Sequence, residues 1–102
     1  MLPLVISDNL SAIKALCEKH KVNQLFVFGS AVSGNFNDKS DVDLLYKFNT
    51  SAVADYFINF FELKENLEKL LKRPVDMVPY ENLQNKYFIE SVEKSKIVLY
   101  EC

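Results

Sequence analysis

Two apolar runs separated by a polar loop constrain the fold of this chain more than any other feature. The first run, residues 25–28, ends directly at Gly29-Ser30, and Asp41-Val42-Asp43 opens the second run after a gap of ten residues. Short apolar runs bounded by turn formers are typical of strands. Successive strand side chains point to opposite faces, so Asp41 and Asp43 share a face. We therefore expect a tight turn at the end of one strand and two carboxylates at the start of the next.

The second strand, predicted over residues 41–48, has two faces of different character. One face is apolar and can pack on helices; it carries Val42, Leu44, Tyr46 and Phe48. The other face should meet a site or solvent; it carries Asp41, Asp43, Leu45 and Lys47. This strand is therefore expected to separate a core from a functional surface.

The remaining pattern predicts alternating helices and strands. Ser7 and Asp8 are N-cap candidates for a first helix that ends near Lys19-His20. Strand 22–28 is apolar on both faces and should be central in its sheet. Pro74 ends a long helix, because it cannot continue the backbone bonding. The other predicted elements are a loop over 33–40, a helix over 55–72, a strand over 75–78, a helix over 82–94 and a strand over 97–100.

This order of elements predicts an α/β fold of the α+β kind, with a small mixed β-sheet and helices packed mainly on one face. The chain has 102 residues, a length that suits one modest core. We therefore expect a single domain over residues 1–102.

Composition argues against some classes of function and location. Lys and Arg total 12 against 14 for Asp and Glu, so there is no basic excess to hold a nucleic-acid backbone, and we expect no direct nucleic-acid binding. A nucleoside triphosphate remains compatible, because a metal ion can neutralise its charge. Cys17 and Cys102 form neither a disulfide framework nor a metal spacing. No apolar run approaches membrane-spanning length, and we expect a reducing, cytoplasmic location away from membranes.

The Gly-Ser turn and the two carboxylates each have a chemical and a plain interpretation. Glycine lets a phosphate approach the backbone closely, and a serine after it can donate to phosphate oxygens. Taken alone, however, Gly29-Ser30 is what a simple strand-ending turn also looks like, because such dipeptides mark turns in general. Asp41 and Asp43 repel each other unless a cation lies between them, and Mg²⁺ prefers such oxygen ligands together with substrate phosphates. A solvated strand end is the plain alternative.

Asp76 is a third acid, inside the apolar run 75–78. An acid in such a run must face solvent or meet a cation, because unpaired burial is costly. If its strand pairs beside the strand of Asp41 and Asp43, three carboxylates converge. Asp76 can then ligate a metal and accept the proton of an attacking hydroxyl; an edge strand with one exposed acid is the alternative.

Other polar and aromatic groups have structural interpretations. His20, the only histidine, lies at a predicted helix end and is expected to be a surface cap. A mixed charged stretch predicts a solvated helix face with ion pairs; it comprises Glu62, Lys64, Glu65, Glu68, Lys69, Lys72 and Arg73. Phe57, Phe60 and Phe61 are expected in the core, with part of the cluster exposed as a partner surface.

Taken together, these residues resemble the minimal nucleotidyltransferases of the DNA polymerase β superfamily. The pattern of that family is a Gly-Ser turn, an Asp-x-Asp pair and a third Asp on a later strand. It is matched here by Phe28-Gly29-Ser30, by Ser40-Asp41-Val42-Asp43-Leu44-Leu45 and by Asp76. The leading helix, the helix before Asp76 and the closing segment 88–100 also fit, so the resemblance covers essentially the whole chain and implies the polymerase β-like fold.

The resemblance implies transfer of AMP from ATP to a hydroxyl with two Mg²⁺ ions. By it, Gly29 and Ser30 contact the triphosphate, and Asp41, Asp43 and Asp76 are both catalytic residues and metal ligands. Many such proteins are antitoxins that silence helical HEPN-domain ribonucleases by AMP transfer to a tyrosine. The resemblance thus implies a HEPN-type toxin partner in a toxin–antitoxin pair, either as a hetero-oligomer or with a homodimer of this chain.

One segment departs from the commoner family pattern. Many relatives carry an arginine between the Gly-Ser turn and the next glycine, where this chain has Ala31-Val32-Ser33-Gly34. An arginine fork is a strong phosphate ligand, and Lys39 and Lys47 are candidates to replace it. Two other interpretations therefore stay open. One is a weak or inactive module that neutralises a partner by occlusion; the other is transfer to a small molecule, although such relatives usually add a substrate-binding domain.

Overall fold

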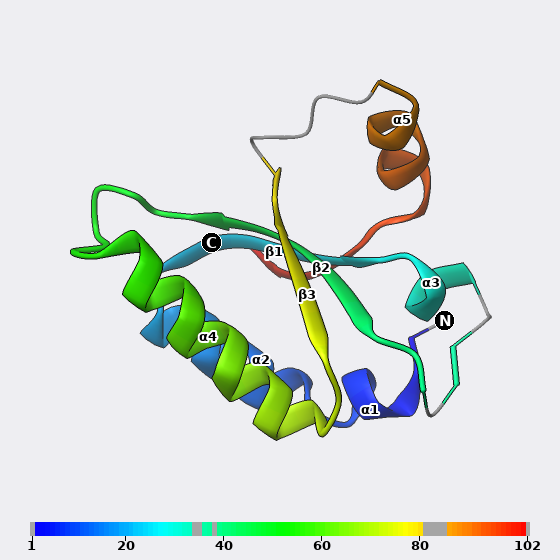
Figure 1. Cartoon of the computed structure of the whole chain (residues 1–102), viewed down its shortest axis with the longest axis horizontal. Helices are drawn as coiled ribbons and strands as arrows, with labels where there is room; N and C mark the ends of the chain where they lie inside the picture. The colour runs from blue at the N-terminus through cyan, green and yellow to red at the C-terminus, as the bar shows by residue number, and fades with distance from the viewer. Residues whose placement is uncertain (1, 34–35, 38, 81–85, 102) are drawn as a thin grey trace.

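A four-stranded mixed sheet in the order β3-β2-β1-β4 organises the chain (Figure 1). The computed structural model describes residues 2–33, 36–37, 39–80 and 86–101. Strand β1 (Val22–Phe28) pairs antiparallel with both β2 (Val42–Phe48) and β4 (Ile97–Glu101). Strand β3 (Val75–Pro79) pairs parallel with β2. The expected mixed sheet is confirmed, and β1 is central, as its two apolar faces predict.

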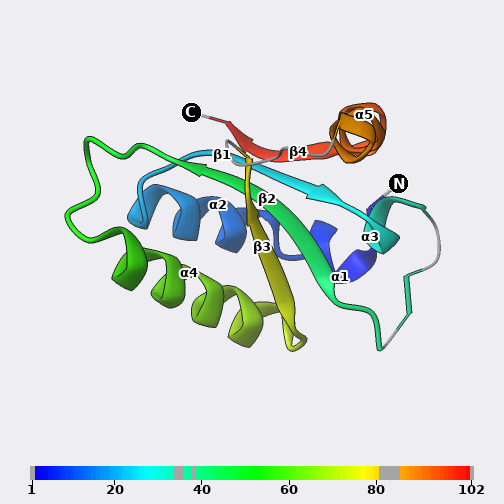
Figure 2. The ribbon, with the colours of Figure 1, turned by 45° about the horizontal axis from the view of Figure 1, so that its top comes forward.

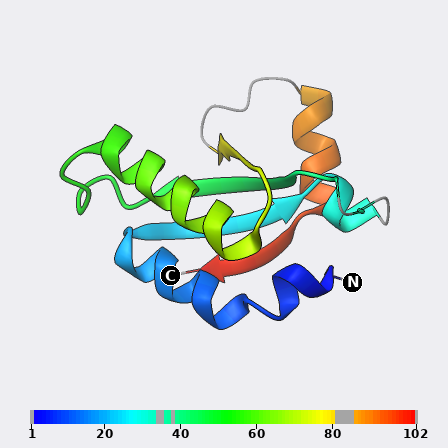
Figure 3. The same cartoon turned by 60° about the horizontal axis from the view of Figure 1, so that its bottom comes forward.

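One face of the sheet is covered by helices (Figure 3). They are α1 (Leu4–Ser7), α2 (Leu10–Lys19) and α4 (Tyr56–Leu71). The short helix α3 (Ser30–Ser33) follows β1 directly. Figure 2 shows α5 (Lys86–Ser95) on the opposite side of the sheet from α2 and α4. The prediction of helices mainly on one face is therefore confirmed.

The main core lies between the sheet and helices α1, α2 and α4. The apolar face of β2 contributes to it as predicted, with Val42, Leu44, Tyr46 and Phe48 all buried. The helices contribute Ile6, Ile13, Cys17, Leu63, Leu67 and Leu71. Burial of these side chains supplies most of the hydrophobic driving force for folding.

A second, smaller core lies under α5 and corrects one expectation about β2. Phe26, Phe28, Leu45 and Val92 form it, and Val78 and Tyr80 pack against it. Leu45 was expected to face a site or solvent, but it is fully buried. The reason is that α5 covers this half of the sheet face, which the sequence of β2 alone does not reveal.

The ends of the long helix follow local chemistry. Asp55 caps α4 by accepting a hydrogen bond from the backbone N–H of Ile58 at 3.0 Å. Lys72 ends the helix in the left-handed conformation with φ 58°, just before Pro74. At the amino end of the chain, the N-cap of α2 is Asn9 rather than Ser7 or Asp8. Residues 82–85 of the last predicted helix lie outside the described residues.

His20 is buried rather than on the surface, with 3% of its area exposed. Its Nδ1 lies 3.0 Å from Oδ1 of Asn59, and Asn59 Nδ2 donates to the His20 carbonyl at 2.7 Å. This pair ties the end of α2 to α4, so the imidazole has a structural partner that sequence spacing did not show. Among the helices that the structure describes, none is long and apolar enough to cross a membrane.

Candidate functional site

The turn at the end of β1 requires a glycine. Gly29 has φ +74°, a conformation that other residues adopt at a cost. A Cβ built on Gly29 would lie 3.2 Å from Cγ of Asp43 and closer still to its Oδ2. The Gly29 backbone therefore lies directly against the Asp43 carboxylate, and Ser30 begins α3 at the same corner.

Asp43 and Asp76 are Cα partners in the parallel pairing of β2 with β3. Register partners project to the same face, and neighbouring strands are about 4.8 Å apart. On the other side of β2, Asp43 is paired with Phe28, the residue before Gly29. The sheet thus places the Gly29 turn, Asp43 and Asp76 in one row across three strands. The strand of Asp76 does pair beside the strand of Asp43, which was the condition set for the acids to come near each other.

Asp41 lies just outside the strand in which it was predicted. Strand β2 begins at Val42, whose N–H donates to the carbonyl of Pro74 at 3.0 Å. Asp41 is exposed, but its charge still contributes to raising the pKa of Asp43. It therefore belongs to the same acidic neighbourhood, although it is held by a loop and not by strand pairing.

The electrostatics of the row are unfavourable without a cation. The pKa of the Asp43 carboxyl is raised above its ordinary value, first by burial and then by the charges of Asp76 and Asp41. Within the described residues, no Lys, Arg or His forms an ion pair with any of the three acids. A cation would relieve both the burial cost and the mutual repulsion.

The three acids are suitable metal ligands by chemistry, but they do not form a closed site. Carboxylate oxygens are the ligands that Mg²⁺ prefers in proteins, usually completed by water and substrate phosphates. Over the described ranges, no three His, Cys, Asp or Glu side chains are gathered closely enough to hold a metal ion. A divalent ion at these acids would therefore need further ligands, such as the phosphate oxygens of a substrate.

Arg73 holds the loop that carries Asp41, and sequence reasoning missed this role. It was expected on a solvated helix face, yet α4 ends before it and Arg73 Nη1 donates to the carbonyls of Asn37 and Ser40, both at 3.1 Å. Its guanidinium carbon lies 4.4 Å from the centre of the Phe36 ring. The available signal was Pro74, which already excluded Arg73 from the helix interior.

The two lysines considered as replacements for the family arginine have different positions. Lys39 lies in the loop held by Arg73, two residues before Asp41. Lys47 is paired with Gln24, whereas Asp43 is paired with Phe28. Four strand residues span about 13 Å, so Lys47 is at the far end of β2 from the acidic row and is the poorer candidate.

Aromatic side chains gather on the other face of the sheet. Phe60 packs against the main core, as expected for this cluster, whereas Phe57 and Phe61 are 72% and 62% exposed and are not core residues. They border a groove of about 400 Å³, lined by Tyr46, Tyr56, Phe57, Phe60, Phe61, Met77 and Pro79. Tyr46 and Met77 alternate in the strands with Asp43 and Asp76, so the groove and the acidic row lie on opposite faces.

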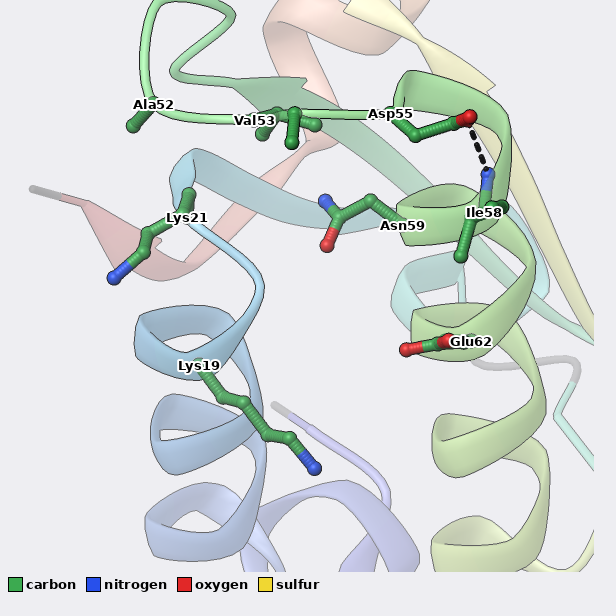
Figure 4. A pocket seen from close by; sticks show the side chains of 9 residues that line it. Lys19, Lys21, Ala52, Val53, Asp55, Ile58, Asn59 and Glu62 are labelled. Carbon is green, nitrogen blue, oxygen red and sulfur yellow. Dashed lines mark hydrogen bonds between the residues drawn. The ribbon is translucent and has the colours of Figure 1, made fainter.

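A further pocket lies between α2 and α4 at the start of β1, opposite the Gly29 end of that strand (Figure 4). Its lining is mixed in charge, with Lys19, Lys21, Asp55 and Glu62. The Asp55 carboxylate is bonded to the Ile58 N–H, as the dashed line in Figure 4 shows. Opposite charges in one small pocket give no selectivity for an anion, so this pocket adds nothing to the candidate site.

Comparison with known proteins finds similar sequences and a similar solved structure. The family model described as polymerase beta, nucleotidyltransferase matches residues 11–102. The protein adenylyltransferase MntA of Thermococcus cleftensis is 39% identical over 72 residues, which cover 71% of this chain and 70% of that protein. A solved structure described as a proposed minimal nucleotidyltransferase matches with a TM-score of 0.76 and 30% identity, covering 95% of both chains.

A more distant match shares the fold alone. It is a complex from Shewanella oneidensis, described as a tri-AMPylated HEPN toxin with an MNT antitoxin. Its TM-score is 0.62 at 21% identity, over 94% of this chain and 72% of that chain. This match therefore supports the fold of the chain.

Proposed function

The chain belongs to the polymerase β nucleotidyltransferase family, and on that premise we propose that it transfers AMP from ATP to a tyrosine hydroxyl of a HEPN-type toxin. It would then be the antitoxin of a toxin–antitoxin pair and act in the cytoplasm as a single domain. The observation that carries this proposal is the row formed by the Gly29 turn, Asp43 and Asp76.

The proposed roles follow from the positions in the row. Gly29 and Ser30 are the proposed triphosphate contacts, because the turn brings backbone within contact of Asp43 and leaves no side chain in the way. Asp41, Asp43 and Asp76 are the proposed ligands of two Mg²⁺ ions. When bound, Mg²⁺ neutralises the charge of the triphosphate and of the leaving pyrophosphate.

In the proposed reaction, the tyrosine oxygen forms a bond to the α-phosphorus of ATP. The bond from that phosphorus to the oxygen bridging the α- and β-phosphates breaks, and pyrophosphate leaves with the electron pair. The hydroxyl proton passes to the Asp76 carboxylate, which is exposed on the edge strand β3 and open to an incoming protein. Asp43, half-buried between Gly29 and Asp76, would help to hold the divalent ion whose charge draws the attacked phosphate to this row.

The choice of partner rests on similarity and on surface character. The MntA relative is named a protein adenylyltransferase, and the Shewanella complex contains an AMPylated HEPN toxin; both statements concern those proteins. In this chain, Phe57 and Phe61 expose apolar area that a partner can cover. The partner surface and the acidic row are on different faces, so a partner must reach round the β3 edge to present its tyrosine.

The test of this function is direct. The full chain is mixed with Mg²⁺, ATP labelled at the α-phosphate and a HEPN-type protein from the same genome. We expect label on a partner tyrosine, and loss of that label with Asp43→Asn. Glu65→Gln is the matched control, because Glu65 is an exposed carboxylate on α4 that pairs with Lys69. Transfer that survives Asp43→Asn, or none from the intact chain, would overturn the proposal.

A second candidate function is favoured by the segment Ala31-Val32-Ser33. Without the family arginine, the same scaffold can neutralise a partner through its exposed aromatic surface and without turnover. Asp41→Ala and Asp76→Ala proteins then still silence the partner in growth assays, whereas the transferase proposal requires that they fail. The double variant Phe57→Ser with Phe61→Ser tests the partner surface itself, and occlusion requires that this variant no longer silences the partner.

A further inference from the structure

A cavity of about 420 Å³ opens beside the Gly29 turn, on the α5 side of the sheet. It is lined by Phe28, Gly29, Val32, Phe88, Ser91, Val92 and Ser95. We propose that this cavity receives the base and ribose of the nucleotide, with Phe88 as the residue that determines affinity for the base. The inference rests on the proposed function and assigns the substrate's nucleoside half to residues on α5.

Position is the first argument. Phe28 and Gly29 belong to both the cavity lining and the acidic row, because Phe28 is the register partner of Asp43 and Gly29 contacts its carboxylate. One ligand can therefore occupy the cavity at one end and reach Asp43 at the other. A nucleotide has this form, with an uncharged ring system joined to an anionic, metal-binding chain.

The chemistry of the lining excludes the phosphates and suits a base. None of the lining residues is charged, so a triphosphate would find no counter-charge inside. The rings of Phe28 and Phe88 meet edge to face, with centroids 5.7 Å apart, and offer aromatic surface to a flat heterocycle. A volume of this size is within the range of roughly 300–1,000 Å³ that small-molecule sites occupy.

Two serine hydroxyls supply polar contacts at the cavity wall. Ser91 and Ser95 are one turn apart on α5, and the Ser95 hydroxyl donates to the Ser91 carbonyl at 2.9 Å. The Ser95 oxygen keeps lone pairs that can accept an N–H from an exocyclic amine, while the Ser91 hydroxyl can donate or accept. An apolar cavity with a few polar groups is the usual form of a small-molecule site.

The acceptor tyrosine also has a flat ring that could occupy this cavity, but the sheet order argues against that assignment. The cavity is on the β1 side of Asp43, whereas Asp76 is on the β3 side, at the open edge of the sheet. The nucleoside is joined covalently to phosphates at the Gly29 turn and must lie near it. An acceptor that belongs to another protein can approach Asp76, which is exposed on the edge strand β3.

The test measures binding by calorimetry, with the full chain, Mg²⁺ and a non-hydrolysable ATP analogue. Inorganic tripolyphosphate is titrated in parallel, because it carries the phosphates without the base. Phe88→Ala removes the ring, and Ser91→Trp fills the cavity from an exposed helix position. Tyr87→Ala is the matched control, since Tyr87 is adjacent in sequence, 83% exposed and absent from the lining.

Phe88→Ala and Ser91→Trp are each expected to lower the affinity for the ATP analogue by at least about fivefold. This factor is the lower end of the effect of losing one base–aromatic stack. Both should bind tripolyphosphate as the parent chain does, and Tyr87→Ala should change neither ligand. Circular dichroism checks that each variant is folded. If Phe88→Ala does not fold, the affinity of Ser91→Trp alone tests the inference.

Unchanged affinity for the analogue in folded Phe88→Ala and Ser91→Trp overturns the inference. So does a Ser91→Trp protein that binds the analogue normally but no longer labels its partner, because the cavity would then hold the acceptor ring. Failure of the proposed function has a different signature, namely base-dependent binding through the cavity with no transfer of label. A parent chain that binds neither ligand overturns both.

Discussion

Gly29 and Asp43 lie so close together that no side chain fits between the end of β1 and the carboxylate on β2. The backbone of one residue forms the wall against which the acid of the other is held. The turn is therefore part of the acidic row and not only a connection between β1 and α3.

Gly29→Ala should disturb folding and ligand binding together. The positive φ of Gly29 costs an L-residue about 1–2 kcal/mol, and the new methyl group must displace the Asp43 carboxylate. We expect a loss of about 1–3 kcal/mol in the free energy of unfolding, measured by urea titration, and loss of nucleotide binding. Normal stability and binding in this variant would contradict the close packing of turn and acid.

Asp43→Asn should stabilise the apo protein while abolishing transfer. The folded-state pKa of Asp43 is raised, so between its ordinary value and the raised one the folded state binds more protons than the unfolded state. Stability then falls as pH rises through that window. The asparagine removes this loss, and we expect a gain of a few tenths to about 1 kcal/mol at neutral pH, measured by urea unfolding between pH 3 and 7.

Mg²⁺ should raise the melting temperature of the parent chain with ATP analogue present. Saturation at 100 times the dissociation constant stabilises by about 2.7 kcal/mol. Asp43→Asn and Asp76→Asn should lose this shift, and Glu65→Gln should keep it, because Glu65 is paired with Lys69 far from the row. The melting temperatures are measured by thermal denaturation. An equal shift in all four proteins would show that the acids are not ligands of the ion.

Arg73→Ala should loosen the loop that carries Asp41. The change removes two hydrogen bonds to the carbonyls of Asn37 and Ser40 and the stacking on Phe36. Hydrogen bonds from a charged donor are worth about 1.5–3 kcal/mol, and we expect a loss in this range with slower transfer. Lys69→Ala is the control, as an exposed cation on α4; equal losses in both variants would assign Arg73 no special role.

Glu68 should give the opposite pH dependence to Asp43. Its pKa is lowered, first by accepting a hydrogen bond from the Val75 N–H and then by Lys64. The stability it contributes is present above its ordinary pKa and is lost as pH falls below it. Glu68→Gln should cost about 1 kcal/mol at pH 7 and little at pH 3, by chemical unfolding, with Glu65→Gln as the neutral comparison.

Local sequence patterns predicted the helices and strands well. Features that depend on contacts between distant elements could not be predicted. The bounds of β1 follow from its apolar run, and α4 differs from prediction by one residue at each end, because Asp55 and Lys72 are its caps. The burial of Leu45 depends on α5, the burial of His20 on Asn59, and the role of Arg73 on carbonyls more than thirty residues earlier. None of these partners is recognisable from sequence spacing.

The candidate row was predictable in kind but not in arrangement. Asp41, Asp43 and Asp76 were identified from residue type and strand position. The pairing of Asp43 with Asp76 required β3 to lie parallel beside β2, and strand order depends on how the intervening helix α4 packs. The cavity beside Phe28 was not foreseen, because it is formed by residues from β1, α3 and α5 together.

The alternation along β2 has a consequence for descent. Val42, Leu44 and Tyr46 hold the core, while Asp43 between them lowers stability at neutral pH. Selection can therefore act on catalysis and on folding through different positions of one strand. A lineage that loses Asp43 keeps its core and is relieved of a repulsion, so the fold can persist after the transferase activity is lost. Well-folded but catalytically inactive relatives of this domain are therefore an expected product of its evolution.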